Sequence, residues 1–252
     1  MSAPLLALQG LTRRFGGLTA VDQVSAEVRR GELVGLIGPN GAGKTTLFNL
    51  ISGVTPPSEG EVRFDGRVIT GMRPFEVARL GVGRTFQNLR TFPNMTVFDN
   101  VSVGAIRTSG LGDALLPRRS SAARSISEIS TEMLEKVGLA GVADELAANL
   151  SYGKRKMLEI ARALAGRPQL LILDEPAAGL NDTETVELAR FIERLRAEGL
   201  TILLVEHDMG LVMRICSRVI VLAFGRKIAD ADPAAVQRDP AVLDAYLGTG
   251  DE

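Results

Sequence analysis

Residues 33–51 read LVGLIGPNGAGKTTLFNLI and combine two apolar segments with a glycine-rich loop. The apolar run Leu33–Ile37 predicts a buried strand, and the apolar spacing after Thr45 predicts a helix. Between them, residues 38–45 match G-x-x-x-x-G-K-[ST], a loop whose backbone N–H groups surround a phosphate at a helix N-terminus. A glycine-rich turn that binds nothing is disfavoured, because strand, loop and helix stand in the required order.

The loop predicts a bound nucleotide and a magnesium ion, with ATP and Mg²⁺ as the expected cofactors. Lys44 is expected to reach the β- and γ-phosphates, a catalytic contact, and the Thr45 hydroxyl is expected to bind Mg²⁺. The candidate nucleotide contacts of the loop are Gly38, Pro39, Asn40, Gly41, Ala42, Gly43, Lys44, Thr45 and Thr46.

Composition narrows the class of protein. The formal charge of −1 argues against a protein that coats nucleic acid. The single cysteine, Cys216, excludes an internal disulfide framework, fits a reducing compartment and is expected to pack rather than react. No apolar run approaches the ~20 residues of a membrane span, and the first residues lack the pattern of a signal peptide. We therefore expect a soluble cytoplasmic chain, with any membrane role exercised through a partner.

The order of apolar segments predicts an α/β fold. Two antiparallel strands are expected at residues 5–15 and 18–28, and a strand at 61–65 is followed by a hairpin. After residue 150, strands and helices alternate, which indicates a parallel sheet. Helices are predicted over residues 97–103 and 126–137. The fold class is thus a P-loop NTPase core with a mostly parallel sheet, an N-terminal antiparallel β-subdomain and a helical insertion. Residues 1–252 form a single domain, with a helical subdomain at about 88–165.

Polar residues follow apolar strands at further points of the chain. In an open α/β sheet the ligand lies beyond the carboxyl ends of the strands. Asp174, after four apolar residues, is expected to hold Mg²⁺ through water, and Glu175 is expected to accept a proton from the attacking water. A solvated acid pair is the disfavoured alternative. His207, the only histidine, also ends an apolar strand and is expected to contact the γ-phosphate or the attacking water rather than to be structural.

Two more side chains are candidates on position alone. Gln87 follows a predicted strand and has an amide that can reach both Mg²⁺ and water, although by itself it would be taken as a surface glutamine. Phe15 precedes the turn between the first two strands. Its ring could stack on a nucleotide base or pack in the fold, and the residues leave both open.

The tripeptide Ser151-Tyr152-Gly153 opens a predicted helix. Ser151 and Gly153 at a helix N-terminus form a second anion site, which a single ATP does not require. Two copies related by a twofold axis would explain it, each serine closing on the ATP held by the opposite loop. An ordinary serine N-cap is the alternative.

The order of these motifs resembles the ATP-binding cassette (ABC) ATPases over nearly the whole chain. Several strings are similar to the LivG-type ATP-binding subunits of branched-chain amino acid permeases. They are residues 15–18 (FGGL), 83–88 (GRTFQN), 177–181 (AAGLN), 205–209 (VEHDM) and 245–248 (AYLG).

The resemblance implies further roles. Phe15 and Val21 would pack on adenine, and Gln87 would sense the groove that receives a helix of the membrane subunit. Ser151 and Gly153 would contact the γ-phosphate of the partner, and Asn181 would lie at the dimer seam. Residues 150–154 read LSYGK where the superfamily more often has LSGGQ, and Asn181 replaces the usual aspartate.

As a function, the resemblance implies an ATPase, converting ATP and water to ADP and phosphate, that energises uptake of branched-chain amino acids or related solutes. Its partners would be transmembrane permease subunits, a second ATP-binding subunit (an identical copy or a related paralogue) and, indirectly, a solute-binding protein, with no nucleic acid. It would lie at the cytoplasmic face of the inner (plasma) membrane, attached peripherally through the membrane subunits. A soluble ABC ATPase that acts as an assembly or nucleic-acid factor is the alternative, disfavoured by the near-neutral charge.

Overall fold

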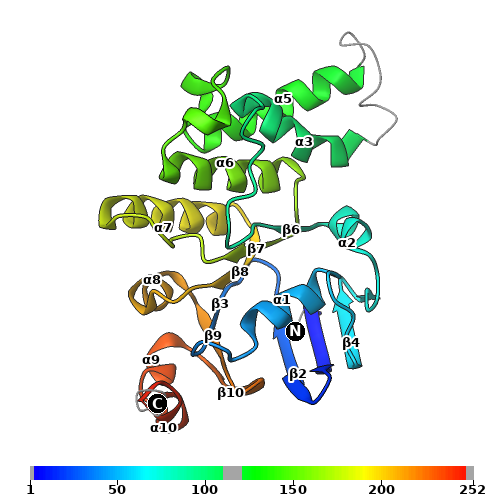
Figure 1. Cartoon of the computed structure of the whole chain (residues 1–252), viewed down its shortest axis with the longest axis vertical. Helices are drawn as coiled ribbons and strands as arrows, with labels where there is room; N and C mark the ends of the chain where they lie inside the picture. The colour runs from blue at the N-terminus through cyan, green and yellow to red at the C-terminus, as the bar shows by residue number, and fades with distance from the viewer. Residues whose placement is uncertain (1–2, 110–120, 248–252) are drawn as a thin grey trace. The chain divides into compact units, whose positions relative to one another are not determined.

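The computed structural model describes residues 3–109 and 121–247, which fall into two compact units (Figure 1). The first unit comprises the chain up to Leu80 together with the chain from Val186 onward, and the second comprises residues 81–185. Within the described residues, no helix is long and apolar enough to cross a membrane.

The first unit contains the predicted antiparallel sheet, in the strand order β2-β1-β4-β5. Strand β1 pairs with β2 so that Leu6 faces Val28 and Phe15 faces Leu18, and β1 also pairs with β4. The bounds of these strands are β1 Leu6–Phe15, β2 Leu18–Val28, β4 Glu59–Phe64 and β5 Arg67–Val68. The antiparallel N-terminal β-portion of the sequence analysis is therefore confirmed.

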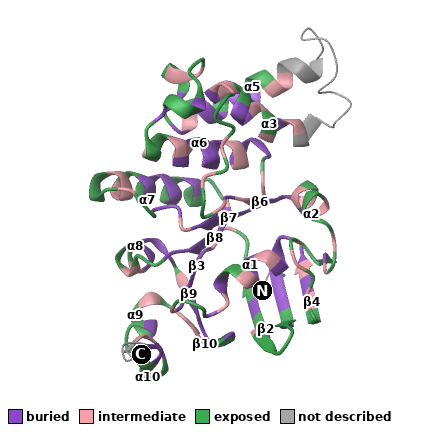
Figure 2. Ribbon diagram, viewed as in Figure 1, coloured by how far each residue is buried: buried purple, intermediate pink, exposed green. Residues whose placement is uncertain are grey.

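The first unit also contains parallel strands, with β3 (Leu33–Ile37) between β8 (Thr201–Val205) and β9 (Arg218–Ala223). Every residue of β3 and β8 is buried (Figure 2), as expected for parallel strands covered on both faces. Strand β10 (Arg226–Ala231) adds an antiparallel edge to β9, which the sequence analysis did not predict.

Helices complete this unit, and one of them explains a glycine in the central strand. A Cβ placed on Gly35 of β3 would lie 2.8 Å from Val212 Cγ1 and 3.1 Å from Cys216 Sγ. Cys216 is buried directly after α8, which confirms that it packs. The helices are α1 Lys44–Ile51, α2 Pro74–Leu80, α7 Asp182–Ala197 (beginning in the second unit), α8 Met209–Ile215, α9 Pro233–Val236 and α10 Pro240–Leu247.

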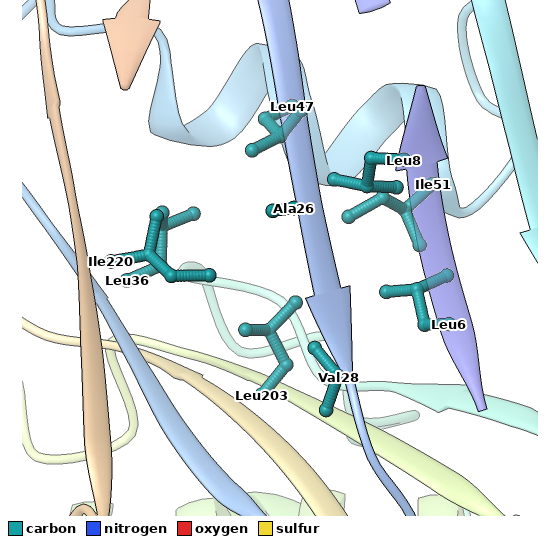
Figure 3. A pocket seen from close by; sticks show the side chains of 9 residues that line it. All are labelled: Leu6, Leu8, Ala26, Val28, Leu36, Leu47, Ile51, Leu203 and Ile220. Atoms are coloured by element: carbon teal, nitrogen blue, oxygen red, sulfur yellow. The ribbon is translucent and has the colours of Figure 1, made fainter. Parts of the chain in front are cut away.

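An apolar layer joins the antiparallel sheet, the parallel strands and helix α1, and it encloses a small cavity (Figure 3). Figure 3 shows that side chains of α1 line the same cavity as side chains of β1 and β3, so the helix takes part in the apolar layer between the two sheets. The lining residues are Leu6, Leu8, Ala26, Val28, Leu36, Leu47, Ile51, Leu203 and Ile220.

The second unit pairs β6 (Val82–Arg84) in parallel with β7 (Leu170–Asp174) and carries the helices of the chain's middle part. Gly104 permits close packing of two of these helices, because a Cβ there would lie 2.0 Å from the Arg162 carbonyl oxygen. The helices are α3 Val97–Ser109, α5 Ser121–Lys136 and α6 Tyr152–Ala165, with the 3₁₀ turns η1 Ala140–Val142 and η2 Ala147–Asn149.

Candidate functional site

The predicted phosphate loop lies between β3 and α1 of the first unit, and two of its glycines are sterically required. Gly38 has φ +151°, and a Cβ there would lie 2.1 Å from the Leu222 carbonyl oxygen. Gly43 has φ +98°, and its Cβ would lie 2.4 Å from the Ala20 carbonyl oxygen. Only glycine fits this combination of close approach and left-handed backbone.

The loop surrounds the ammonium group of Lys44. This side chain is 6% exposed, and its Nζ donates hydrogen bonds to the carbonyl oxygens of Gly38 (2.7 Å) and Pro39 (3.0 Å). Among the described residues, no side chain caps the N-terminus of α1, and the first turn of this helix has no acidic residue. The helix N-terminus and the lysine together favour an anion at the loop.

The described residues contain no group of three or more His, Cys, Asp or Glu side chains that could hold a metal ion. Mg²⁺ in nucleotide sites does not depend on such a group, because it usually keeps several waters and binds one or two carboxylates plus substrate phosphates. The oxygen donors of Thr45, Gln87 and Asp174 are of the type that Mg²⁺ prefers.

The second unit places Asp174 at the end of β7, after four fully buried apolar residues. The Arg84 guanidinium lies 3.2 Å from Asp174 Oδ2, and the Asp174 backbone N–H donates to the Thr85 hydroxyl. Burial raises the pKa of the Asp174 carboxyl, and the charge of Arg84 opposes that rise. The carboxyl group of Asp174 is thus held in place by a partly buried guanidinium group.

The structure brings the side chains of Gln87 and Glu175 together, a contact that the sequence analysis did not predict. Gln87 Nε2 donates to Glu175 Oε2 at 2.9 Å. Lys156 Nζ, from α6, donates to the carbonyl oxygens of Gln87 (3.4 Å) and Glu175 (3.1 Å). Glu175 has φ +49°, which is uncommon for a residue with a side chain.

Sequence reasoning missed Lys156 and Glu159, two charged residues that are buried on α6. The Phe86 backbone N–H donates to Glu159 Oε1, and burial raises the pKa of the Glu159 carboxyl. The helical spacing of the sequence could have revealed both residues. Lys156 and Glu159 lie on the same face as Ile160, where a charge has no reason to lie unless it has a partner.

Ser151 and Gly153 lie at the start of α6, and both have local roles. The Ser151 hydroxyl accepts from the Lys154 backbone N–H at 3.4 Å, so the predicted alternative of a serine N-cap is present. A Cβ on Gly153 would lie 2.5 Å from Glu184 Oε1. Asn181 and Glu184 cap the start of α7 reciprocally, each backbone N–H donating to the side chain of the other.

The remaining candidates lie in the first unit. Phe15 is 46% exposed, with the Arg13 guanidinium 4.5 Å from its ring centroid, so its ring presents apolar surface to solvent. Val21 is fully buried in β2. His207 is exposed directly after β8. The structure therefore divides the candidates: the phosphate loop, Phe15 and His207 belong to one unit, while Gln87, Ser151 and the acids at 174 and 175 belong to the other.

Comparison with known proteins decides the family. The model of the ABC transporter family matches residues 21–178, more than half of the chain. The chain belongs to the ABC transporter family. A second family model, the branched-chain amino acid ATP-binding cassette transporter, matches residues 226–252.

Individual relatives agree with this assignment to the ABC ATPases. The high-affinity branched-chain amino acid transport ATP-binding protein LivG of Salmonella typhimurium is 46% identical, covering 98% of this chain and 99% of the relative. The solved ADP conformation of MJ1267, an ATP-binding cassette of an ABC transporter, has 31% identity and a TM-score of 0.85, covering 98% and 100% of the two chains. The dimeric post-hydrolysis state of the ATP-binding cassette MJ0796, bound to ADP and Pi, has 25% identity and a TM-score of 0.76, covering 90% and 98%.

The family confirms the predicted fold class and the predicted enzyme class. The chain is an ATP-binding cassette ATPase with an α/β P-loop fold.

Proposed function

We propose that this ABC ATPase energises the uptake of branched-chain amino acids or related solutes through separate transmembrane permease subunits. The observation that carries the proposal is the similarity to LivG over 98% of the chain, together with the match of the branched-chain family model at residues 226–252. The protein then works at the cytoplasmic face of the inner (plasma) membrane, attached peripherally to the permease. A solute-binding protein is an indirect partner that delivers the solute.

The proposed nucleotide contacts are those of the phosphate loop, residues 38–46, with Lys44 on the β- and γ-phosphates. Mg²⁺, held by Thr45, Gln87 and Asp174, would neutralise part of the phosphate charge. Phe15 offers its exposed ring to the adenine base. Val21 is buried beside the loop glycine Gly43, so in this proposal it supports the adenine site from the core side.

The proposed chemistry is in-line attack of water on the γ-phosphorus. As the water oxygen bonds to phosphorus, Glu175 accepts its proton and the bond to the ADP oxygen breaks. The hydrogen bond from Gln87 orients the Glu175 carboxylate, and Lys44 stabilises the charge on the phosphates. His207, exposed at the end of its strand, contacts the γ-phosphate or the water.

The proposal includes a second ATP-binding subunit, either an identical copy or a related paralogue. The exposed α6 N-terminus, with Ser151 and Gly153, contacts the γ-phosphate bound by the partner. Asn181, at the start of α7, lies at the seam between the two subunits. The dimeric state of the related cassette MJ0796 supports this arrangement. Within each chain, residues 88–165 form the helical subdomain of a single ATPase domain, and α3, α5 and α6 fall in this range.

Transport reconstitution tests the proposal. The chain is co-expressed with candidate transmembrane permease subunits, and the complex is purified in detergent and placed in liposomes with the solute-binding protein. We expect ATP-dependent accumulation of radiolabelled leucine or valine, and none with Glu175→Gln. Purification of the chain with soluble partners alone, or accumulation that proceeds equally with Glu175→Gln, would contradict the proposal.

A further inference from the structure

Lys156 is a buried lysine for which the proposed reaction gives no role. It lies on α6 and is 3% exposed, yet it is an ammonium ion on a helix face that is otherwise largely apolar. Burying such a charge is costly unless it is paired and hydrogen-bonded. Its location therefore calls for a physical reason.

The reason is visible in what the ammonium group contacts. Lys156 Nζ donates to two backbone carbonyl oxygens, Gln87 O at 3.4 Å and Glu175 O at 3.1 Å. The Tyr152 ring centroid lies 5.8 Å from Nζ and provides an aromatic wall. The two accepting residues are the two whose side chains bond to each other. Lys156 thus closes a ring of hydrogen bonds that runs through the main chain and side chains of Gln87 and Glu175.

The backbone of Glu175 needs this support. Its φ of +49° lies in the left-handed region, where a residue with a side chain is strained. Such a conformation persists only when the surroundings over-determine it, and it commonly marks a functional site. The Glu175 carbonyl oxygen accepts from both Lys156 Nζ and the Ala178 backbone N–H. Loss of the lysine would leave this turn with one restraint fewer.

Charge explains why a lysine suits this position. Burial raises the pKa of the Asp174 and Glu159 carboxyls, and the charge of Lys156 acts on both in the opposite direction. Arg84 and Arg162 are the other cations that act on these two acids. Lys156 is the cation that also bonds to the main chain of Gln87 and Glu175.

We propose that Lys156 is a positioning residue of the ATPase site, holding Glu175 and Gln87 in register through their backbone carbonyl groups. It touches neither nucleotide nor water and acts through Glu175. The inference rests on the proposed role of Glu175 as the group that accepts the proton. Because Lys156 lies on α6, the helix that follows Ser151, it links the position of α6 to the position of Glu175.

The first test separates turnover from binding. Lys156→Met removes the charge and the donors at similar volume, and Lys136→Met, on a partly exposed position of α5, is the matched control. We expect Lys156→Met to lower kcat about 10- to 100-fold, the usual effect of losing an orienting partner. Affinity for ATP, measured by equilibrium dialysis, should change less than about threefold, because the phosphate loop is untouched. Lys156→Arg, which keeps charge and donors, should recover much of the rate.

Folding is monitored for each variant by thermal unfolding. If Lys156→Met does not fold, Lys156→Gln replaces it, because the glutamine side chain is uncharged and one bond too short to hold both carbonyl oxygens. An unchanged kcat in a folded Lys156→Met protein, or in the folded Lys156→Gln protein that replaces it, would overturn the inference. Equal losses of kcat and ATP affinity, or a failure of arginine to recover any rate, would also overturn it.

A double-mutant cycle tests whether Lys156 acts through Glu175. In the Glu175→Gln background, adding Lys156→Met should change the residual kcat by less than about threefold, because groups that act as a unit are not additive. A full multiplicative loss would contradict the inference. Hydrolysis by Glu175→Gln at the unsubstituted rate would instead contradict the proposed role of Glu175. A stalled Glu175→Gln beside a fully active Lys156→Met would contradict the Lys156 inference alone.

Discussion

Gln87 and Glu175 are 88 positions apart in the chain, and the amide of the first donates to the carboxylate of the second at 2.9 Å. The contact joins the end of β6 to the end of β7, two neighbouring parallel strands. It places a carboxylate, whose oxygen can take a proton, beside an amide that can orient it. The proposed chemistry of the enzyme depends on this pair.

Glu175→Gln should stall hydrolysis while ATP binding is retained. Removing a general base typically costs about 10²- to 10⁴-fold in rate, whereas the phosphate loop remains intact. Phosphate release and equilibrium dialysis measure the two effects separately. Glu187→Gln, on an exposed position of α7, is the control and should hydrolyse ATP normally. A Glu175→Gln protein that turns over within a few-fold of normal would remove Glu175 from the mechanism.

Gly43→Ala should damage both the loop and nucleotide binding. The φ of +98° and the close Ala20 carbonyl oxygen leave no room for a Cβ. We expect the free energy of unfolding to fall by about 1–3 kcal/mol, the cost of a strained backbone. The measurements are urea unfolding and titration with a fluorescent ATP analogue.

Gly141→Ala is the matched control, because a Cβ at Gly141 meets nothing within 4 Å. It should leave both unfolding and binding unchanged. Equal behaviour of the two variants would show that the loop geometry is not the constraint described above.

Cys216 should be protected from alkylation in the folded protein. Burial raises the pKa of its thiol to about 12, while an unfolded thiol titrates near ~8.5. At pH 9, iodoacetamide should modify urea-unfolded protein rapidly and native protein very slowly, which mass spectrometry measures.

The same thiol predicts a pH dependence of stability. Between about pH 8.5 and pH 12 the unfolded chain releases the proton of Cys216 and the folded chain keeps it. The unfolded state then binds fewer protons, so the free energy of unfolding falls as pH rises through this range. Cys216→Ala should remove that part of the slope. An identical slope in both proteins would assign it to other groups.

The sequence predicted the central strands closely and the edges less well. Strands β3, β8 and β9 are uninterrupted or nearly uninterrupted apolar runs, so their bounds follow from burial. Strand β10 reads RKIADA and is only partly buried, so no apolar pattern marks it. Its hairpin turns at Phe224-Gly225, with both φ values positive, and a phenylalanine is an unusual residue for such a turn. Helix α3 continues beyond the predicted residue 103, because Gly104 serves close helix packing rather than ending the helix.

In the candidate site, too, some residues are marked by a local sequence pattern and others are not. Asp174, Glu175 and Gln87 could be found because each follows a strand, and strand ends gather at one edge of a sheet. The partners that hold them, Arg84 and Lys156, could not be assigned. A contact between charges that are distant in the chain leaves no local pattern in a single sequence.

In the proposed enzyme a second ATP-binding subunit completes each ATP site, and substitutions of Ser151 test this arrangement. Ser151→Asp keeps an N-cap of similar strength and adds a negative charge where the γ-phosphate held by the partner is proposed to bind. Ser151→Asn also keeps the N-cap and is the neutral control. Both are made in the Glu175→Gln background, and the oligomeric state is measured by gel filtration with multi-angle light scattering in MgATP. We expect an ATP-dependent dimer for Glu175→Gln and for Ser151→Asn, and a monomer that still binds ATP for Ser151→Asp. A dimer that forms equally well with Ser151→Asp and with Ser151→Asn would contradict the proposal that Ser151 contacts the γ-phosphate bound by the other subunit.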